Sequence, residues 1–132
     1  MCHTLLDAIE QGDIAGVDAC YAPDMTLWAN ISGKEITRDE NLAVLEKGRG
    51  VHRRRTYDDR IVNTFDDGFM AQYTVSIVTH DGTKRALWAC LVAEVRDGKV
   101  TKLFDYLDSG KFGTPPATSE RRAMDGPERG IR

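Results

Sequence analysis

The pattern of apolar and polar positions changes near Arg55, with helix-like segments before it and strand-like alternation after it. Residues 4–11 have the composition of a helix that ends at Gly12. Asp13 can then cap a second helix, which Pro23 terminates. The N-terminal part of the chain therefore predicts a hairpin of two short helices.

One strand and the longest helix come next. Residues 25–31 are rich in strand-forming residues. Thr37 and Glu40 have the spacing of a capping box, which predicts a helix that begins at Thr37 and ends at Gly48 or Gly50.

Four alternating runs follow, at residues 55–65, 69–80, 83–95 and 99–108. Each turn between them contains an Asp-Gly pair, which is the strongest short-range signal for a β-hairpin. Helices followed by an antiparallel meander predict an α+β fold in which the helices cover one face of a curved sheet.

The composition narrows the class of protein. The chain has 132 residues and a net charge of -3, which fits one domain with no general attraction to nucleic acid or to a membrane. Residues 1–112 form the predicted domain, and residues 113–132 a flexible polar tail. Three scattered cysteines, Cys2, Cys20 and Cys90, encode neither a disulfide framework nor a metal site, which favours a reducing, cytoplasmic location. No apolar run reaches the length of a membrane span, and Asp7 interrupts any signal-peptide core.

The basic run of residues 51–55, VHRRR, has two interpretations. It could bind phosphate, or its charges could lie in solvent where they complement the end of the preceding helix. The acidic chain and the lack of interleaved aromatic residues favour the second interpretation.

The last strand carries a carboxylate among apolar side chains. Alternation places Leu103, Asp105 and Leu107 on one face and Phe104 and Tyr106 on the other. If the first face is the one that the helices cover, Asp105 lies in a mostly apolar cavity, where burial raises the pKa of a carboxyl group. The alternative is that Asp105 acts as a cap or pairs with an arginine at the rim.

The loop between the second and third of these runs decides which side of its strands faces the helices. A two-residue loop at Asp81-Gly82 pairs Val75 with Trp88 on the face away from the helices. The opposite face of this strand, towards the helices, then carries a row of polar side chains: Gln72, Thr74 and Ser76.

The next hairpin has two possible loops. A three-residue loop pairs Cys90 with Phe104, whereas a two-residue loop would pair Cys90 with Asp105. With the longer loop, eight apolar side chains share the face away from the helices: Tyr73, Val75, Ile77, Trp88, Cys90, Val92, Phe104 and Tyr106. Such a patch, of the order of 600 Å², exceeds what monomers usually expose, so we predict a homodimer through this face.

Three stretches of the chain resemble the nuclear transport factor 2-like superfamily, in particular its SnoaL-like branch: GDIAGVDACYAPDMTLW, GKEITRDENLAVLE and EVRDGKVTKLFDYLDS. The resemblance covers residues 4–112 and extends to limonene epoxide hydrolase and ketosteroid isomerase. It implies a cone-shaped, strongly curved antiparallel sheet with three helices packed on its concave face. It also implies that Asp105 faces the pocket of the cone.

The resemblance can be carried over residue by residue. Trp28-Ala29-Asn30 looks like the aromatic-x-Asn motif that holds a water in the epoxide hydrolases, and Asp105 matches one of their two aspartates. Thr74 and Ser76 stand at the positions of their arginine and second aspartate. SnoaL-type cyclases are more similar, because their chemistry uses an acid/base aspartate at the position of Asp105.

We therefore expect an enzyme without cofactor or metal that acts on a small, largely apolar metabolite as a cyclase, isomerase, dehydratase or hydrolase. Asp105 is the expected general acid/base, and Asn30 orients a water or carbonyl. The expected substrate-binding residues are Trp28, Gln72, Thr74, Ser76, Leu87, Leu91 and Leu103. The alternative is a non-catalytic ligand-binding or assembly module of the same fold.

Overall fold

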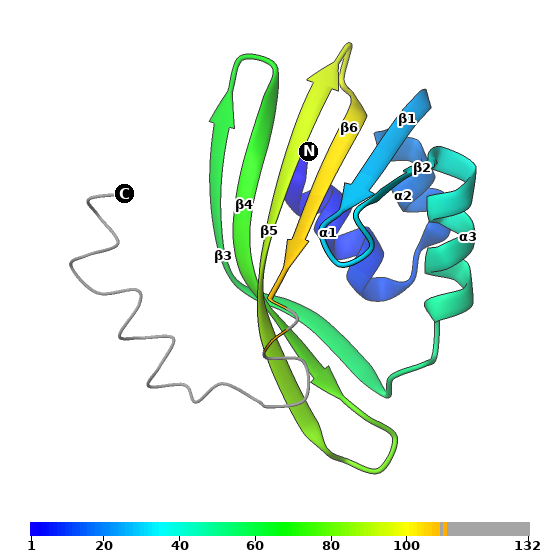
Figure 1. Ribbon diagram of the computed structural model, residues 1–132, viewed down its shortest axis with the longest axis vertical. Helices are drawn as coiled ribbons and strands as arrows, with labels where there is room; N and C mark the ends of the chain where they lie inside the picture. Colours follow the sequence, from blue (N-terminus) through cyan, green and yellow to red (C-terminus); the bar gives the residue numbers. More distant parts are fainter. Residues whose placement is uncertain (109, 111–132) are drawn as a thin grey trace, which may run out of the picture.

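The computed structural model describes residues 1–108 and residue 110. Along the chain the elements are α1 (Cys2–Gln11), α2 (Ile14–Cys20), β1 (Tyr21–Ala29), β2 (Lys34–Thr37), α3 (Arg38–Gly48), β3 (Arg54–Phe65), β4 (Gly68–Val78), β5 (Lys84–Arg96) and β6 (Lys99–Leu107). The predicted α+β fold with three helices and a strongly curved sheet is confirmed (Figure 1). The predicted tail of residues 113–132 lies outside the described residues.

The helix ends follow the local signals in the sequence. Gly12 ends α1 in the left-handed conformation, with a φ of 69°. Asp13 caps α2, because its carboxylate accepts a hydrogen bond of 3.0 Å from the backbone N–H of Gly16. At the start of α3, Thr37 and Glu40 form the predicted capping box.

The strands form one sheet in the order β2-β1-β6-β5-β4-β3. Every neighbouring pair is antiparallel except β1 and β6, which are parallel, so the sheet is mixed rather than antiparallel as predicted. The parallel pair arises because the last strand of the meander returns to the first strand of the chain, far away in sequence. This pairing places Leu27 beside Leu103 on one face and Trp28 beside Phe104 on the other.

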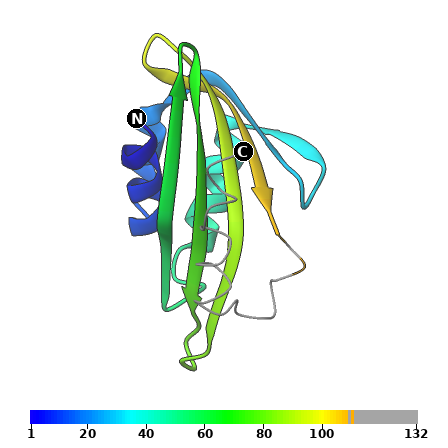
Figure 2. The same cartoon turned by 90° about the vertical axis from the view of Figure 1, so that its left-hand side faces the viewer.

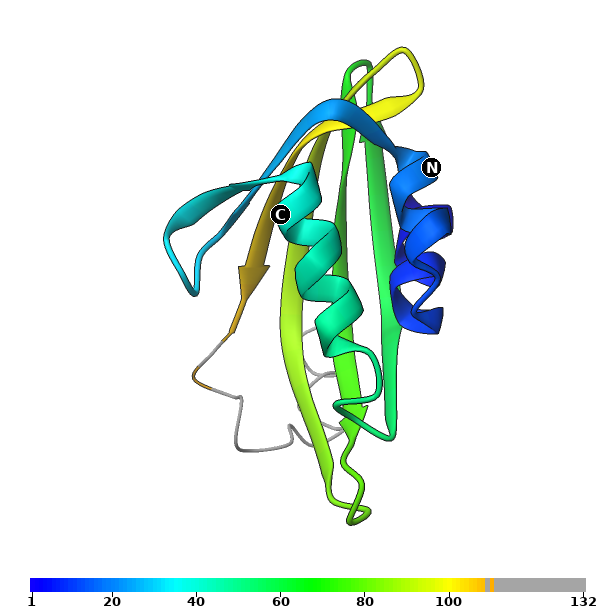
Figure 3. The same cartoon turned by 90° about the vertical axis from the view of Figure 1, so that its right-hand side faces the viewer.

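The helices lie on one side of the sheet. In Figure 3, α3 lies in front of the sheet and the pair α1 and α2 lies beside β3, in agreement with the contacts of α1 with β3 and of α3 with β1. Among the described residues no helix covers the other side, which faces the viewer in Figure 2. We call these two sides the inner face and the outer face.

The hairpin between β4 and β5 differs from the prediction. Its loop runs over residues 79–83, because Val78 pairs with Lys84. The carboxylate of Asp81 accepts a hydrogen bond of 3.0 Å from the N–H of Thr83, and Thr79 pairs with Thr83 through the backbone, which holds the loop at five residues rather than two.

This loop moves the register by one residue. Val75 pairs with Leu87, and Trp88 pairs with Thr74. A shift of one residue exchanges the faces of a strand. The predicted faces of β4 are therefore wrong: Tyr73, Val75 and Ile77 lie on the inner face, where each is at most 6 % exposed, and Gln72, Thr74 and Ser76 lie on the outer face.

The hairpin between β5 and β6 has the two-residue loop. Asp97 and Gly98 both have positive φ, and an irregularity after Glu94 adds one residue to β6. The predicted pairing of Cys90 with Phe104 is wrong, because Cys90 pairs with Tyr106. The added residue restores the alternation, so the aromatic side chains of β6 still share the outer face with Cys90.

The core lies between the inner face and the helices. Its largest fully buried side chains are Leu5, Leu6, Val17, Met25, Leu87, Val100 and Leu103. Within residues 1–108 and residue 110, no helix is long and apolar enough to cross a membrane.

Candidate functional site

A small cavity of about 80 Å³ lies between the inner face and the helices, and we call it the inner chamber. Its polar lining consists of Tyr21, Asn41, Tyr57, Tyr73 and Asp105. Its apolar lining consists of Ile9, Leu27, Leu45, Leu91 and Leu103. A cavity with an apolar wall and a few convergent polar groups is typical of a small-molecule site.

Asp105 supplies the carboxylate of the inner chamber. It pairs in register with Leu91, so its side chain points to the inner face. Burial raises its pKa from the usual 3.8 to about 6. Within the described residues its carboxylate forms no ion pair or hydrogen bond. The structure therefore does not show the alternative, in which Asp105 acts as a cap or pairs with an arginine at the rim. A carboxyl group with such a pKa can give or take a proton near neutral pH.

Asn41 and Tyr21 form a fixed polar pair in the same chamber. The hydroxyl of Tyr21 donates a hydrogen bond of 2.8 Å to Oδ1 of Asn41, which is 6 % exposed. This bond fixes the orientation of the Asn41 amide, and its nitrogen is the remaining donor of that side chain.

Tyr57 and Tyr73 form the wall of the chamber on β3 and β4. Their ring centroids lie 5.2 Å apart in a tilted arrangement. Burial raises the pKa of Tyr57 and of Tyr73, and the charge of Asp105 raises each further. Both tyrosines therefore keep their hydroxyl protons at neutral pH and serve as hydrogen-bond donors.

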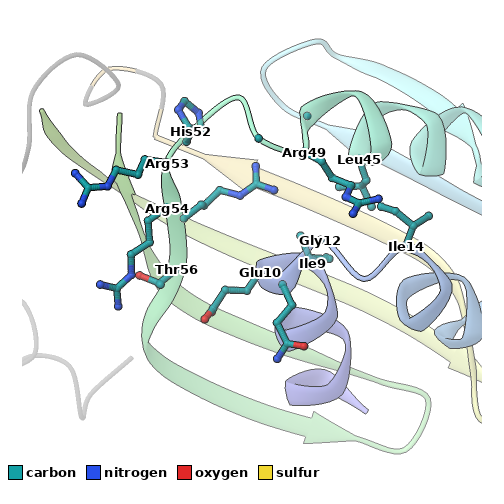
Figure 4. A pocket seen from close by; sticks show the side chains of 14 residues that line it. Ile9, Glu10, Gly12, Ile14, Leu45, Arg49, His52, Arg53, Arg54 and Thr56 are labelled. Atoms are coloured by element: carbon teal, nitrogen blue, oxygen red, sulfur yellow. The ribbon is translucent and has the colours of Figure 1, made fainter. Parts of the chain in front are cut away.

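A larger cleft of about 490 Å³ adjoins the inner chamber, and we call it the outer cleft. The two cavities share Ile9 and Leu45 in their lining. Figure 4 shows Leu45 and Arg49 at the end of α3 on one side of the cleft, and His52 and Arg53 in the segment that leads into β3 on another. The outer cleft and the inner chamber are therefore neighbouring cavities on the helix side of the sheet.

The structure brings together only part of the site that the sequence predicts. Asp105, Leu91 and Leu103 line the inner chamber. Leu87 is buried on the inner face but is not part of the lining. The polar row of Gln72, Thr74 and Ser76 lies on the outer face, for the reason of register given above.

Trp28 and Asn30 also lie elsewhere. Trp28 points to the outer face, where its ring lies 5.5 Å from that of Tyr106. The exposed Asn30 uses its amide on the backbone of Leu107, to which it donates a hydrogen bond of 3.0 Å and from which it accepts one of 2.8 Å. Asn30 therefore joins β1 to the end of β6 and does not line the inner chamber.

Sequence reasoning missed the other polar residues that line the inner chamber with Asp105. Asn41 stands four residues before Leu45 in α3, so both lie on the same face of that helix. This spacing was the one signal available for Asn41. The face of Tyr73 depended on the hairpin loop, and nothing local placed Tyr21 and Tyr57 beside Asp105.

The residues described in the structure contain no group of three or more His, Cys, Asp or Glu side chains that could hold a metal ion. Independently of this, the polar groups that line the inner chamber, Asp105 among them, are of the kinds that acid/base chemistry uses.

Comparison with known proteins gives one family and many similar structures. The model of the SnoaL-like domain family matches residues 3–103. No curated protein matches.

Three solved structures illustrate the similarity. A candidate polyketide cyclase from Xanthomonas campestris is 23% identical, with a TM-score of 0.71 over 80% of this chain and 85% of that one. An epoxide hydrolase of the limonene type from M. tuberculosis is 21% identical, with a TM-score of 0.69 over 85% and 83%. A protein with a ketosteroid isomerase-like fold from Catenulispora acidiphila is 13% identical, with a TM-score of 0.73 over 86% and 92%. At these identities the structures show a common fold.

Proposed function

The chain belongs to the SnoaL-like domain family, and we propose that it is an enzyme that transfers a proton on a small, largely apolar metabolite, with Asp105 as the general acid/base. The observation that carries this proposal is the position of Asp105 in the inner chamber, where burial raises its pKa to about 6. Cyclisation by carbon-carbon bond formation, isomerisation, dehydration and hydrolysis all need such a proton transfer.

The remaining polar groups of the chamber would orient the reacting group. A carbonyl oxygen that gains negative charge in the transition state needs hydrogen-bond donors fixed in place. The amide nitrogen of Asn41 and the hydroxyls of Tyr57 and Tyr73 are such donors, and all three side chains belong to the lining. Asn41 takes the orienting role that the sequence assigned to Asn30.

The sizes of the two cavities suggest how a substrate would lie. The volume of about 80 Å³ in the inner chamber is room for only a few heavy atoms, since one water occupies about 30 Å³. The reacting carbonyl end would enter the inner chamber. The body of the metabolite would stay in the outer cleft of about 490 Å³.

A non-catalytic ligand-binding or assembly module is the second candidate, because the same fold serves without chemistry in some proteins. In that case the inner chamber would be a passive cavity, and Asp105 would matter for stability alone. Turnover by the unmodified protein separates the two candidates.

The experiment begins with a panel of polyketide, terpenoid and steroid-like carbonyl compounds, tested by thermal shift and then for turnover. For a compound that is turned over, Asp105→Asn should keep the fold and the binding but lower kcat by about a hundredfold to ten-thousandfold. Asp108→Asn, which removes a carboxylate outside the inner chamber, is the matched control and should keep kcat. An Asp105→Asn protein with unchanged kcat would assign the chemistry to another residue.

We also propose that two copies of the chain associate through the outer face. After the correction of the register, this face still carries five of the predicted interface residues: Trp88, Cys90, Val92, Phe104 and Tyr106. Tyr106 is the most exposed of these five residues, at 42 %. Trp28 extends the patch onto β1 through its ring contact with Tyr106. The inner chamber lies on the other side of the sheet, so association through the outer face would not bury its lining.

A further inference from the structure

The charges around the outer cleft are opposite in sign to those of the whole chain. Glu10 is the one acidic residue in the lining of the cleft. Four arginines line it as well: Arg49, Arg53, Arg54 and Arg55. The chain as a whole has a net charge of -3. A basic cleft in an acidic protein attracts an anion to that one place.

The acidic side chains in or next to the cleft, Glu10 and Glu46, already have partners. Glu10 accepts hydrogen bonds of 3.1 Å from Arg60 and 3.0 Å from the N–H of Tyr57, so its charge is balanced within β3. Arg49 pairs with Glu46 at 3.2 Å. Within the described residues Arg53, Arg54 and Arg55 form no ion pair, so the cleft keeps an excess of positive charge.

Arg55 lies where the outer cleft meets the inner chamber. It pairs with Ile77, two residues before Tyr57, and therefore projects from the inner face of β3. Its guanidinium carbon lies 5.8 Å from the centroid of the Tyr57 ring. Arg55 lines the outer cleft, whereas Tyr57 lines the inner chamber.

The electrostatics at Tyr57 agree with this position. Burial is the main cause of the raised pKa of Tyr57; the charge of Arg55 lowers that pKa and the charge of Asp105 raises it. Arg55 and Asp105 are thus both close enough to act on the same hydroxyl, one from the cleft and one from the chamber.

We propose that the substrate is an organic anion whose charged group binds Arg55 in the outer cleft while its uncharged reacting end enters the inner chamber. A guanidinium group presents a planar set of donors that suits a carboxylate or a similar oxyanion. This inference rests on the proposed function for its account of the inner chamber. The anion site itself stands on the geometry of the outer cleft.

A pair of fluorescent dyes tests the anion site without any knowledge of the substrate. Anilinonaphthalene sulfonate and its uncharged parent anilinonaphthalene share one apolar body and differ in the anionic group. The unmodified protein should bind the sulfonate more tightly than the parent. Arg55→Gln should weaken binding of the sulfonate by about tenfold and leave binding of the parent unchanged, because only the charged hydrogen bonds are lost.

Two further variants separate the site from general charge. Arg55→Lys keeps the charge and should retain a preference for the sulfonate. Arg96→Gln removes the same charge from the exposed hairpin between β5 and β6, outside the outer cleft, and should bind both dyes as the unmodified protein does. Circular dichroism confirms that each variant is folded.

A competition experiment in the unmodified protein covers the case in which Arg55→Gln does not fold. Naphthalene carboxylate should displace the bound sulfonate dye, and its uncharged methyl ester should do so about tenfold less well. Equal affinity for the two dyes, equal competition by acid and ester, or an equal loss in Arg96→Gln would each overturn the proposal.

The dye experiment also distinguishes failure of this inference from failure of the proposed function. Asp105→Asn should keep the preference for the sulfonate, because the carboxylate lies in the inner chamber. If Asp105→Asn keeps full turnover while Arg55→Gln loses the dye preference, the acid/base role fails and the anion site stands.

Discussion

The two faces of one sheet give the same strands different properties. On the inner face of β5, Leu87 and Leu91 are 2 % and 4 % exposed beneath the helices. On the outer face of the same strand, Trp88 and Cys90 are only partly buried. The inner face also holds Asp105, where burial raises the pKa to about 6. What covers a face, rather than the residue types on it, decides whether a side chain supports the fold, the chemistry or association.

The strongest way to test this comparison uses two neighbours on β4. Val75 is 6 % exposed on the inner face, and Ser76 lies on the outer face between Thr56 and Ala86. Val75→Asp should lower the free energy of unfolding by about 3–5 kcal/mol, because an unpaired carboxylate would be buried. Ser76→Asp should change it by less than about 1 kcal/mol. Urea unfolding of both variants measures the difference, and the reverse order would restore the register that we predicted from a two-residue loop.

The next test concerns the carboxylate that distinguishes the inner face. The carboxyl group of Asp105 has a pKa of 3.8 in an unfolded chain and about 6 in the folded protein. Between these values the folded state binds more protons, so the free energy of unfolding falls as the pH rises from 4 to 6. The loss amounts to about 2–3 kcal/mol and persists above pH 6.

Asp105→Asn removes this loss. The variant should match the unmodified protein near pH 4 and be about 2–3 kcal/mol more stable at pH 8. Thermal or urea unfolding at both pH values gives the difference, in which the effects of other carboxylates such as Asp81 cancel. A constant difference across the pH range would mean that the carboxylate of Asp105 is not desolvated.

Signals at the helix ends predicted the elements well, whereas side-chain hydrogen bonds within one hairpin loop decided the register. Gly12, Asp13 and the capping box of Thr37 act within a few residues, so the sequence shows them directly. The loop between β4 and β5 depends on hydrogen bonds of Asp81 with Thr79 and Thr83, which a hairpin rule based on Asp-Gly does not include. One wrong loop length was enough to exchange the faces of β4.

The missed strand has a similar explanation. Strand β2 has four residues, is mostly exposed and is stabilised by pairing with β1 rather than by a pattern of its own. Short edge strands of this kind carry little hydrophobic signal.

For the site, the sequence could locate Asp105 but not the other polar residues of the inner chamber. Alternation with Leu103 assigned Asp105 to a face, and the resemblance to the family assigned that face to the pocket. Tyr21, Asn41 and Tyr57 reach the inner chamber from β1, α3 and β3, elements that meet only after folding. No spacing in the sequence relates them to Asp105.

A substitution that places a charge at the most exposed aromatic residue of the outer face tests whether two copies associate through this face. Tyr106 is 42 % exposed, so the fold of a single chain should tolerate Tyr106→Glu. If the outer faces pack together, the unmodified protein is a dimer at micromolar concentration and Tyr106→Glu weakens association by about 2 kcal/mol or more, a factor of more than ten.

Sedimentation velocity of both proteins gives the result. Val44→Glu, at an exposed apolar residue of α3, is the matched control and should remain a dimer. A monomeric unmodified protein, or a Tyr106→Glu variant as dimeric as its parent, would mean that the outer face stays open to solvent.

The smallest expected effect concerns Asn30, which lies just after β1 and beside the end of β6. Its amide makes two hydrogen bonds with the backbone of Leu107, at 3.0 Å and 2.8 Å, and the side chain is exposed. Asn30→Ala should lower the free energy of unfolding by about 1 kcal/mol, because water replaces much of what is lost. For a compound whose turnover depends on Asp105, the kcat of Asn30→Ala should change by less than about threefold. Removal of an acid/base group lowers kcat far more. Urea unfolding and turnover of the same preparation separate the two effects. A folded Asn30→Ala protein with kcat as low as that of Asp105→Asn would return Asn30 to the chemistry and place the reacting group nearer the end of β6 than the inner chamber.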